Sequence, residues 1–228
     1  KKNKSKIVSL TAYSKNIAKI LDKYCDIVLV GDSMANVLYG LSNTHSISIE
    51  NIIQHTISVK KGVKDSLLVV DMPKGTYDNI SEAKKNAKSI MRSTKCDAVK
   101  IESNGRNFNI IKELVKIKIP VMGHIGFTPQ FKNNFKIEGD SKKKAIKLLK
   151  EAKNVEKSGA FSIVLECIFP LTSKLITKNL NIPTIGIGSS SYCDGQILVT
   201  DDMLGISGFY PKFVKKYAFL DRIIEKAV

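Results

Sequence analysis

The sequence predicts a single α/β domain over residues 1–228, folded as a (β/α)8 barrel of the TIM type. Short apolar runs alternate with amphipathic segments along the whole chain, and no stretch of linker composition interrupts them. Five of the apolar runs end in an acid or a histidine, as expected where parallel strands release polar side chains at one end of a barrel. The 228 residues, 43% of them hydrophobic, suffice for such a core. A doubly wound open sheet is the alternative that the same alternation allows.

The first half of the chain predicts three strands and three helices. The run IVLVGDS, residues 27–33, is interpreted as a buried strand, because four apolar residues, three of them β-branched, precede a glycine. Ser14 and Ser81 are the expected starts of two helices, and Gly62 is expected in the C′ position that ends another. Residues 34–48 are expected to form an irregular loop above the barrel. The expected elements are strands over residues 7–11, 27–33 and 66–71, and helices over residues 15–23, over residues 48–62 and from residue 81 onward.

The second half continues the same alternation. A polar segment over residues 130–140 leads into a long basic helix that Gly159 ends. The candidate for the strand that closes the barrel spans residues 196–199. The expected elements are strands over residues 98–102, 121–124, 162–166, 184–188 and 196–199, and helices over residues 108–117, 141–157 and 172–180.

The net charge of +16 raises the question of a nucleic-acid surface. The densest run of lysines, residues 142–157, also carries regularly spaced apolar residues such as Leu148, Ala152 and Val155. That pattern is typical of a solvated outer helix face and favours neither nucleic acid nor a membrane as partner. The positive field should nevertheless favour small anionic substrates.

The cysteine pattern and the hydropathy predict a cytoplasmic protein. Cys25, Cys96, Cys167 and Cys193 form no CxxC pair and are interpreted as reduced thiols. No apolar run reaches the length of about 18 residues that a membrane span needs, and residues 1–6 lead into a strand without the apolar core of a signal peptide.

Three strand ends carry carboxylates, Asp32, Asp71 and Glu102. If the barrel brings them together, they repel one another unless a cation lies between them, and oxygen ligands suit a hard divalent ion such as Mg²⁺. The alternative for any one of these acids is a helix cap or a surface position. Lys100 lies two residues before Glu102 on the same side of its strand, so it either neutralises the acids or contacts a substrate anion.

Two further strand ends offer groups for proton transfer. Glu166 is followed by Cys167 and apolar residues, which would desolvate its carboxyl group and suit it to act as a general base. His124 is interpreted as a base, a hydrogen-bond donor or a satisfied core histidine, whereas His45 and His55 have no comparable setting. The sequence around Gly186 fails the spacing of a dinucleotide or NTP loop.

Taken together, these motifs resemble one family, ketopantoate hydroxymethyltransferase of pantothenate biosynthesis. The resemblance covers nearly the whole chain in order, and the ordered set of motifs is specific. The matching stretches are LTAY (10–13), VGDS (30–33), HT (55–56), DMP (71–73), VKIE (99–102), GHIGFTPQ (123–130), LEC (165–167), IGIG (185–188), DGQILV (194–199) and PKF (211–213).

The resemblance implies a barrel of the phosphoenolpyruvate mutase/isocitrate lyase kind and a large homo-oligomer, commonly a decamer. It also implies that 3-methyl-2-oxobutanoate (α-ketoisovalerate) is the substrate and 5,10-methylenetetrahydrofolate the co-substrate, with 2-dehydropantoate as product. The implied roles are Mg²⁺ binding by Asp32, Asp71 and Glu102, substrate contacts from Asp32, Ser33, Asp71, Lys100 and His124, and proton acceptance by Glu166.

The chain departs from the family pattern in loops around the expected site. Lys74 replaces a usual aromatic residue, His45 and Ser46 replace a usual Leu-Pro pair, and Ser190 replaces a glycine. Because these loops surround the site, a Mg²⁺-dependent C–C lyase or hydrolase of another 2-oxo acid is the alternative enzyme. A basic nucleic-acid-binding protein on a degenerate barrel is the alternative of a different class.

Overall fold

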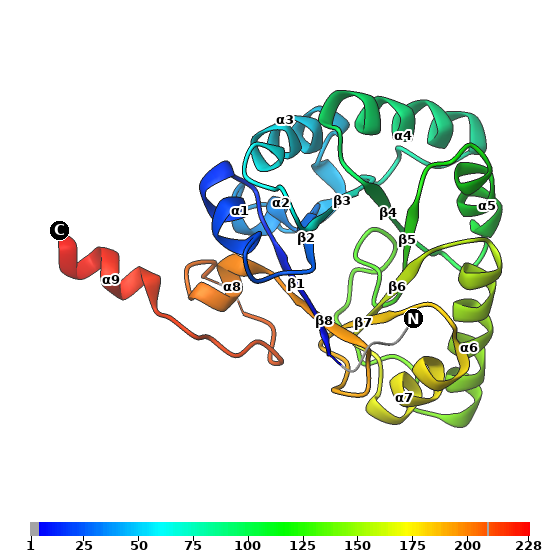
Figure 1. The fold of residues 1–228 in the computed structure, drawn as a ribbon. Coiled ribbons are helices and arrows are strands. Elements are labelled where there is room, and N and C mark those ends of the chain that lie inside the picture. Colours follow the sequence, from blue (N-terminus) through cyan, green and yellow to red (C-terminus); the bar gives the residue numbers. More distant parts are fainter. Residues whose placement is uncertain (1–4, 209) are drawn as a thin grey trace.

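The computed structural model describes residues 5–208 and 210–228. Its strands are all parallel and form a closed barrel in sequence order, from β1 to β8, with β8 pairing back onto β1 (Figure 1). This closure confirms the (β/α)8 barrel and excludes the open doubly wound sheet. The strands are β1 (Ile7–Thr11), β2 (Ile27–Val30), β3 (Leu67–Asp71), β4 (Ala98–Glu102), β5 (Val121–Gly126), β6 (Ser162–Glu166), β7 (Thr184–Ile187) and β8 (Gly195–Leu198).

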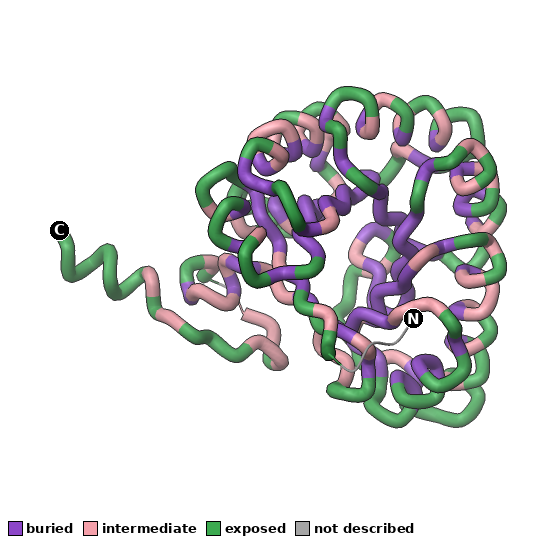
Figure 2. The backbone as a smooth tube through the Cα atoms, viewed as in Figure 1, coloured by how far each residue is buried: buried purple, intermediate pink, exposed green. Residues whose placement is uncertain are grey.

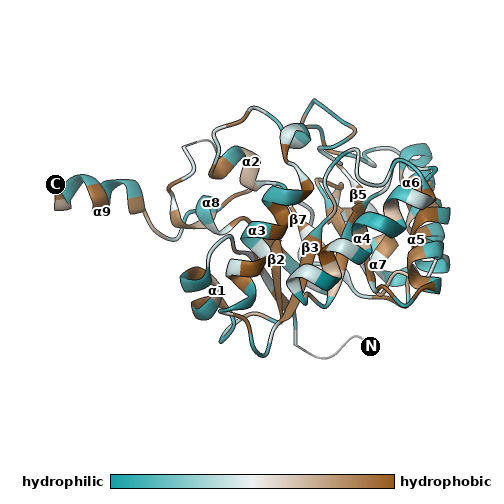
Figure 3. Ribbon diagram, turned by 90° about the horizontal axis from the view of Figure 1, so that it is seen from above, coloured by the Kyte–Doolittle hydropathy of each residue, from teal (hydrophilic) through white to brown (hydrophobic). Residues whose placement is uncertain are grey.

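Helices surround the barrel, and their outward faces are exposed while the strands are buried (Figure 2). Figure 3 shows the same division by hydropathy, with apolar strands inside and hydrophilic helix surfaces outside. The helices are α1 (Lys15–Leu21), α2 (Met34–Val37), α3 (Ile49–Lys60), α4 (Ile80–Thr94), α5 (Phe108–Lys116), α6 (Lys142–Lys157), α7 (Pro170–Asn179), α8 (Thr200–Leu204) and α9 (Leu220–Ala227), with a 3₁₀ helix at Thr44–Ser46.

The two-residue period of the strands places the polar side chains at one end of the barrel interior. An apolar cluster fills the interior and includes Val69, Ala98, Met122 and Val164. Successive strand residues point to opposite faces, so the residues two positions later return to the interior, nearer the C-terminal ends of the strands. Those residues are Asp71, Lys100, His124 and Glu166.

The basic helix α6 behaves as its pattern predicts. Leu148, Ala152 and Val155 are its buried residues and pack against the barrel. In contrast, α9 has no buried residue and stands away from the barrel (Figure 1). Among the residues that the structure describes, no helix is both long and apolar enough to cross a membrane.

Two local expectations are wrong. Helix α4 is capped by Asn79, whose side chain accepts a hydrogen bond from the Glu82 N–H, and not by Ser81. The expected irregular loop contains α2 and the 3₁₀ helix. The expected C′ position of Gly62 is confirmed, because Lys61 is the C-cap of α3. A Cβ at Gly62 would lie 2.4 Å from the carbonyl oxygen of Lys15, where α3 ends against α1.

Candidate active site

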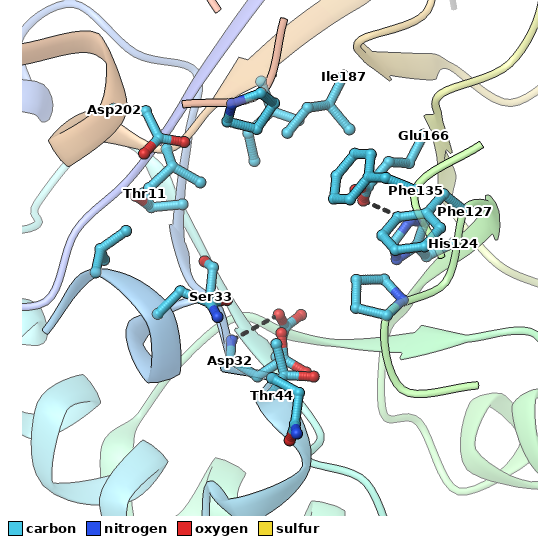
Figure 4. A pocket seen from close by; sticks show the side chains of 18 of the residues that line it. Thr11, Asp32, Ser33, Thr44, His124, Phe127, Phe135, Glu166, Ile187 and Asp202 are labelled. Carbon is cyan, nitrogen blue, oxygen red and sulfur yellow. Dashed lines mark hydrogen bonds and ion pairs between the residues drawn. The ribbon is translucent and has the colours of Figure 1, made fainter. Parts of the chain in front are cut away.

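A cavity of about 820 Å³ opens at the C-terminal ends of the strands. It is lined by every residue that the sequence predicts for the site, and Figure 4 shows several of them around its wall. The predicted convergence of distant strand ends on one place is therefore confirmed. The predicted site residues on the wall are Asp32, Ser33, Asp71, Lys100, Glu102, His124 and Glu166.

Three carboxyl groups and one ammonium group form the buried part of this wall. Asp71 links its neighbours, because its Oδ2 accepts a hydrogen bond from the Asp32 N–H at 3.0 Å and its Oδ1 lies 2.9 Å from Lys100 Nζ. Asp32, Asp71, Lys100 and Glu102 are each no more than 6% exposed. Burial raises the pKa of Asp32 well above its usual range, and the charges of Asp71 and Glu102 add to this effect.

Lys100 carries its charge despite its burial. Desolvation acts to lower the pKa of Lys100, but the carboxylates of Asp71, Glu102 and Asp32 outweigh it and raise the pKa above its ordinary value. Of the two roles that the sequence allows for Lys100, this geometry favours neutralisation of the acids. Lys100 supplies one positive charge to three carboxyl groups, so burial and the charges of Asp71 and Glu102 still disfavour the ionised form of Asp32.

Gln130 holds two of the acids in place and was not among the residues that the sequence predicted. Its side-chain Nε2 donates to Asp32 Oδ2 at 2.8 Å and to the Met72 carbonyl oxygen at 3.0 Å. Its backbone N–H donates to Glu102 Oε2 at 2.9 Å, and its own Oε1 accepts from the Tyr77 hydroxyl. Burial raises the pKa of Tyr77 well above its usual value, which keeps that hydroxyl protonated as a donor.

His124 lies between two carboxylates. Its Nδ1 is 3.5 Å from Glu102 Oε1, and its Nε2 is 3.1 Å from Glu166 Oε2. Burial and the nearby Lys100 act to lower the pKa of His124, but the hydrogen bonds to Glu102 and Glu166 raise it to about 9. The imidazole is therefore charged at neutral pH, and its Nε2 forms an ion pair with Glu166.

Ser33 is positioned by a tyrosine from the end of β1. The hydroxyl groups of Tyr13 and Ser33 are 2.8 Å apart. The carbonyl of Tyr13 is 2.8 Å from His55 Nδ1, and since a carbonyl can only accept, Nδ1 carries the proton of that ring. His55 Nε2 then accepts from the Tyr39 hydroxyl at 2.9 Å. This places His55 in a supporting role beside the site.

The donor set fits a hard divalent cation. Asp32, Asp71 and Glu102 offer oxygen atoms only. Burial, together with the charges of Asp71 and Glu102, raises the pKa of Asp32, and a bound divalent ion would stabilise its ionised form. Within the described part of the chain, no three His, Cys, Asp or Glu side chains are already gathered in ligating positions. The contacts of Gln130 explain this, because its two N–H groups occupy oxygens of Asp32 and Glu102.

Two of the residues that depart from the family pattern contact each other outside the cavity. Lys74 Nζ lies 3.2 Å from His45 Nδ1, and His45 Nε2 lies 3.0 Å from the Pro129 carbonyl oxygen. Neither His45 nor Lys74 is among the described residues that line the cavity, and nor is Ser190.

A family model and curated relatives match the whole chain. The model for ketopantoate hydroxymethyltransferase matches residues 1–228. The 3-methyl-2-oxobutanoate hydroxymethyltransferase of Pelagibacter ubique (strain HTCC1062) is 52% identical over 227 residues, which cover 100% of this chain and 88% of that protein. An enzyme of the same name with the suffix 2, from Zymomonas mobilis subsp. mobilis, is 46% identical over 232 residues and 85% of its length.

Solved structures with low sequence identity share the fold. The structure of 2,3-dimethylmalate lyase, a PEP mutase/isocitrate lyase superfamily member, has a TM-score of 0.64 at 14% identity and covers 98% of this chain and 93% of its own. Phosphonopyruvate hydrolase in complex with oxalate and Mg²⁺ has a TM-score of 0.65 at 10% identity, covering 85% and 75%. At such identities the likeness shows the fold alone, a (β/α)8 barrel.

Proposed function

The chain belongs to the ketopantoate hydroxymethyltransferase family, and we propose that its barrel-end cavity transfers a hydroxymethyl group to 3-methyl-2-oxobutanoate. The donor in this proposal is 5,10-methylenetetrahydrofolate, and the product is 2-dehydropantoate, in the pathway to pantothenate and coenzyme A. The observation that carries the proposal is the convergence of three carboxylates, Lys100 and the His124–Glu166 pair on one cavity, in a chain whose relatives carry the name of this enzyme.

Asp32, Asp71 and Glu102 would hold Mg²⁺ in this proposal. When bound, the ion supplies Lewis-acid chemistry that draws electrons from the 2-oxo group and makes the C3 proton easier to remove. Lys100 Nζ, 2.9 Å from Asp71 Oδ1, holds that carboxyl group in position. The solved phosphonopyruvate hydrolase, which holds oxalate and Mg²⁺, supports a metal in a barrel of this kind.

The substrate would lie over the acids, beside the hydroxyl group of Ser33 and the imidazole of His124. Ser33, held by Tyr13, is the expected donor to the substrate carboxylate. Lys100 and His124 add positive charge to this part of the wall. An anionic 2-oxo acid is thus favoured over a neutral substrate.

Glu166 is proposed to accept the C3 proton. His124 Nε2 lies 3.1 Å from Glu166 Oε2 in an ion pair, which holds that side of the carboxylate and leaves Oε1 for the proton. The side chain of Glu166 is 12% exposed, so it reaches the cavity while most of its surface is shielded from water. C3 then forms a bond to the one-carbon unit of the folate, and the bonds from that carbon to N5 and N10 break as both nitrogens take up protons. Water supplies the hydroxyl oxygen of the product, and tetrahydrofolate leaves.

We also propose a cytoplasmic homo-oligomer. The four cysteines are free and buried, which suits a reducing compartment. Helix α9 exposes Phe219, Ile223 and Ile224 near the C-terminal end, and this apolar face favours association with a further copy of the chain, with a decamer as the expected size.

Deuterium exchange tests the proposed base. The protein is incubated in heavy water with Mg²⁺ and 3-methyl-2-oxobutanoate, and loss of the C3 proton is followed by NMR. We expect metal-dependent exchange in the wild type and a decrease of about 10²- to 10⁴-fold in Glu166→Gln, the range for loss of a general base. Glu113→Gln is the matched control, since Glu113 lies on α5 in an ion pair with Lys84.

Two results would contradict the proposal. If the wild type shows no metal-dependent exchange, the cavity does not enolise the substrate. If Glu166→Gln exchanges the C3 proton at the wild-type rate, Glu166 is not the base. Adding the folate then separates hydroxymethyl transfer from a lyase or hydrolase, because only transfer yields 2-dehydropantoate in proportion to the folate consumed. Cleavage of other 2-oxo acids without folate would favour the alternative enzyme.

A further inference from the structure

The cavity is larger than a small 2-oxo acid requires. Its volume of about 820 Å³ lies within the range of about 300–1,000 Å³ that is usual for drug-sized ligands. The acid-rich wall described above accounts for one side of it. The remaining wall is therefore open to a second, larger ligand.

That remaining wall contains a buried carboxyl group without a cationic partner. Asp202 lies on α8, shortly after β8, and is 7% exposed. Its Oδ1 accepts a hydrogen bond from the Ser207 hydroxyl, and within residues 5–208 and 210–228 its Oδ2 has no hydrogen-bond or ion-pair partner. Burial raises the pKa of Asp202, so ligand donors that reach the carboxylate would stabilise its charged form.

Aromatic side chains flank the same cavity. The rings of Phe127 and Phe135 have centroids 4.1 Å apart, and the centroids of Phe135 and Phe213 are 6.4 Å apart. All three residues line the cavity. Figure 4 shows Phe127 and Phe135 beside His124 and Glu166, and Asp202 across the cavity from them. The cavity thus offers a cluster of tilted aromatic rings and, apart from it, a carboxylate.

We infer that Asp202 binds the 2-amino-4-oxopyrimidine edge of the folate pterin ring. This inference rests on the proposed function, which requires a folate in the cavity. The pterin edge presents two neighbouring N–H donors, at N3 and the 2-amino group, and a carboxylate accepts such a pair through its two oxygens. The ring body packs against apolar and aromatic surface, and the one-carbon unit lies on the side of Glu166.

The charges of the two walls exclude the reverse arrangement, in which the 2-oxo acid would lie at Asp202 and the pterin at the acid-rich wall. An anionic 2-oxo acid placed at Asp202 would meet a buried carboxylate without a compensating cation. At the opposite wall it meets the ammonium group of Lys100 and, in the proposed function, Mg²⁺ held by the acids. The N–H donors of the pterin favour the carboxylate of Asp202, so each substrate has one matching wall.

The test compares tetrahydrofolate with its 2-desamino-2-methyl analogue, which lacks one of the two donors. Binding of each compound is measured by calorimetry on the full chain, with Mg²⁺ and 3-methyl-2-oxobutanoate present. We expect Asp202→Asn to weaken tetrahydrofolate binding about 10- to 100-fold, the effect of losing charge-assisted hydrogen bonds. We also expect the wild type to prefer tetrahydrofolate over the analogue, and Asp202→Asn to lose that preference.

Asp201→Asn is the matched control, because Asp201 is the adjacent acid but is not among the described residues that line the cavity. It should retain both the affinity and the preference. If Asp202→Asn binds tetrahydrofolate as the wild type does, or keeps the preference over the analogue, the inference is wrong. Metal-dependent C3 exchange in the wild type, which needs no folate, then separates this failure from a failure of the proposed function.

Discussion

Gly126, the last residue of β5, controls the position of Glu166. Its φ is +98°, and it pairs with Glu166 on the neighbouring strand β6. A Cβ at this position would lie 2.1 Å from the Glu166 carbonyl oxygen and 2.8 Å from the side chain of Ile168. The Gly126→Ala substitution must therefore move the end of β6, which carries the proposed base.

The expected loss of stability has two parts. Placing alanine at a positive φ costs about 1–2 kcal/mol. The overlap adds about 1–3 kcal/mol, the usual cost of overpacking, because the Glu166 carbonyl must retreat by about 0.9 Å to reach the 3.0 Å below which Cβ contacts are not seen. That movement also stretches the 2.8 Å hydrogen bond that the carbonyl accepts from the Phe127 N–H. The sum is about 2–5 kcal/mol.

Urea unfolding measures this loss, with Gly75→Ala as the matched control. Gly75 has a φ of +81°, but a Cβ there would meet nothing within 4 Å, so its substitution isolates the backbone cost. We expect Gly126→Ala to be less stable than Gly75→Ala and to exchange the C3 proton of the substrate more slowly. Equal stability of the two variants would refute the argument from the close approach of β5 and β6.

Two further variants test the electrostatics and the substrate contact. Replacing Lys100 by Met removes the cation 2.9 Å from buried Asp71 and should lower the free energy of unfolding by about 3–5 kcal/mol without Mg²⁺. The control Lys84→Met, in a more exposed ion pair, should cost at most about 1 kcal/mol. Similar losses in the two variants would contradict the buried pairing. Tyr13→Phe removes the hydrogen-bond partner of Ser33. We expect the KM for 3-methyl-2-oxobutanoate to rise about 2- to 10-fold in steady-state assays. An unchanged KM would show that Tyr13 does not support substrate binding.

The strand-borne part of the candidate site could be predicted because strand periodicity is strict. Once a residue such as Ala98 faces the interior, Lys100 and Glu102 face it too, and the same step leads from Val164 to Glu166. The closed barrel then brings together strand ends that are far apart in sequence. For these residues, an apolar run with a polar end was sufficient information.

The loop-borne part could not be predicted in the same way. Gln130 reaches Asp32 and Glu102 because the chain after β5 folds back over the barrel, and no periodicity determines that path. Asp202 did carry a signal, since it follows the short apolar strand β8 as the other acids follow theirs. It was missed because the last strand was the least distinct in the sequence.

His45 and Lys74, which depart from the expected family pattern, belong to one hydrogen-bonded contact between loops. The Pro129 carbonyl can only accept, so His45 Nε2 carries the proton and Nδ1 accepts from Lys74. This contact connects the loops that follow β2, β3 and β5. Pro129 directly precedes Gln130, which holds two of the proposed metal ligands. Because Lys74 and His45 contact each other beside the cavity and not within it, the two changes alter how the loops are supported. They leave the cavity wall to the residues that match the family motifs, which is consistent with retention of the family's reaction in a chain with altered loops.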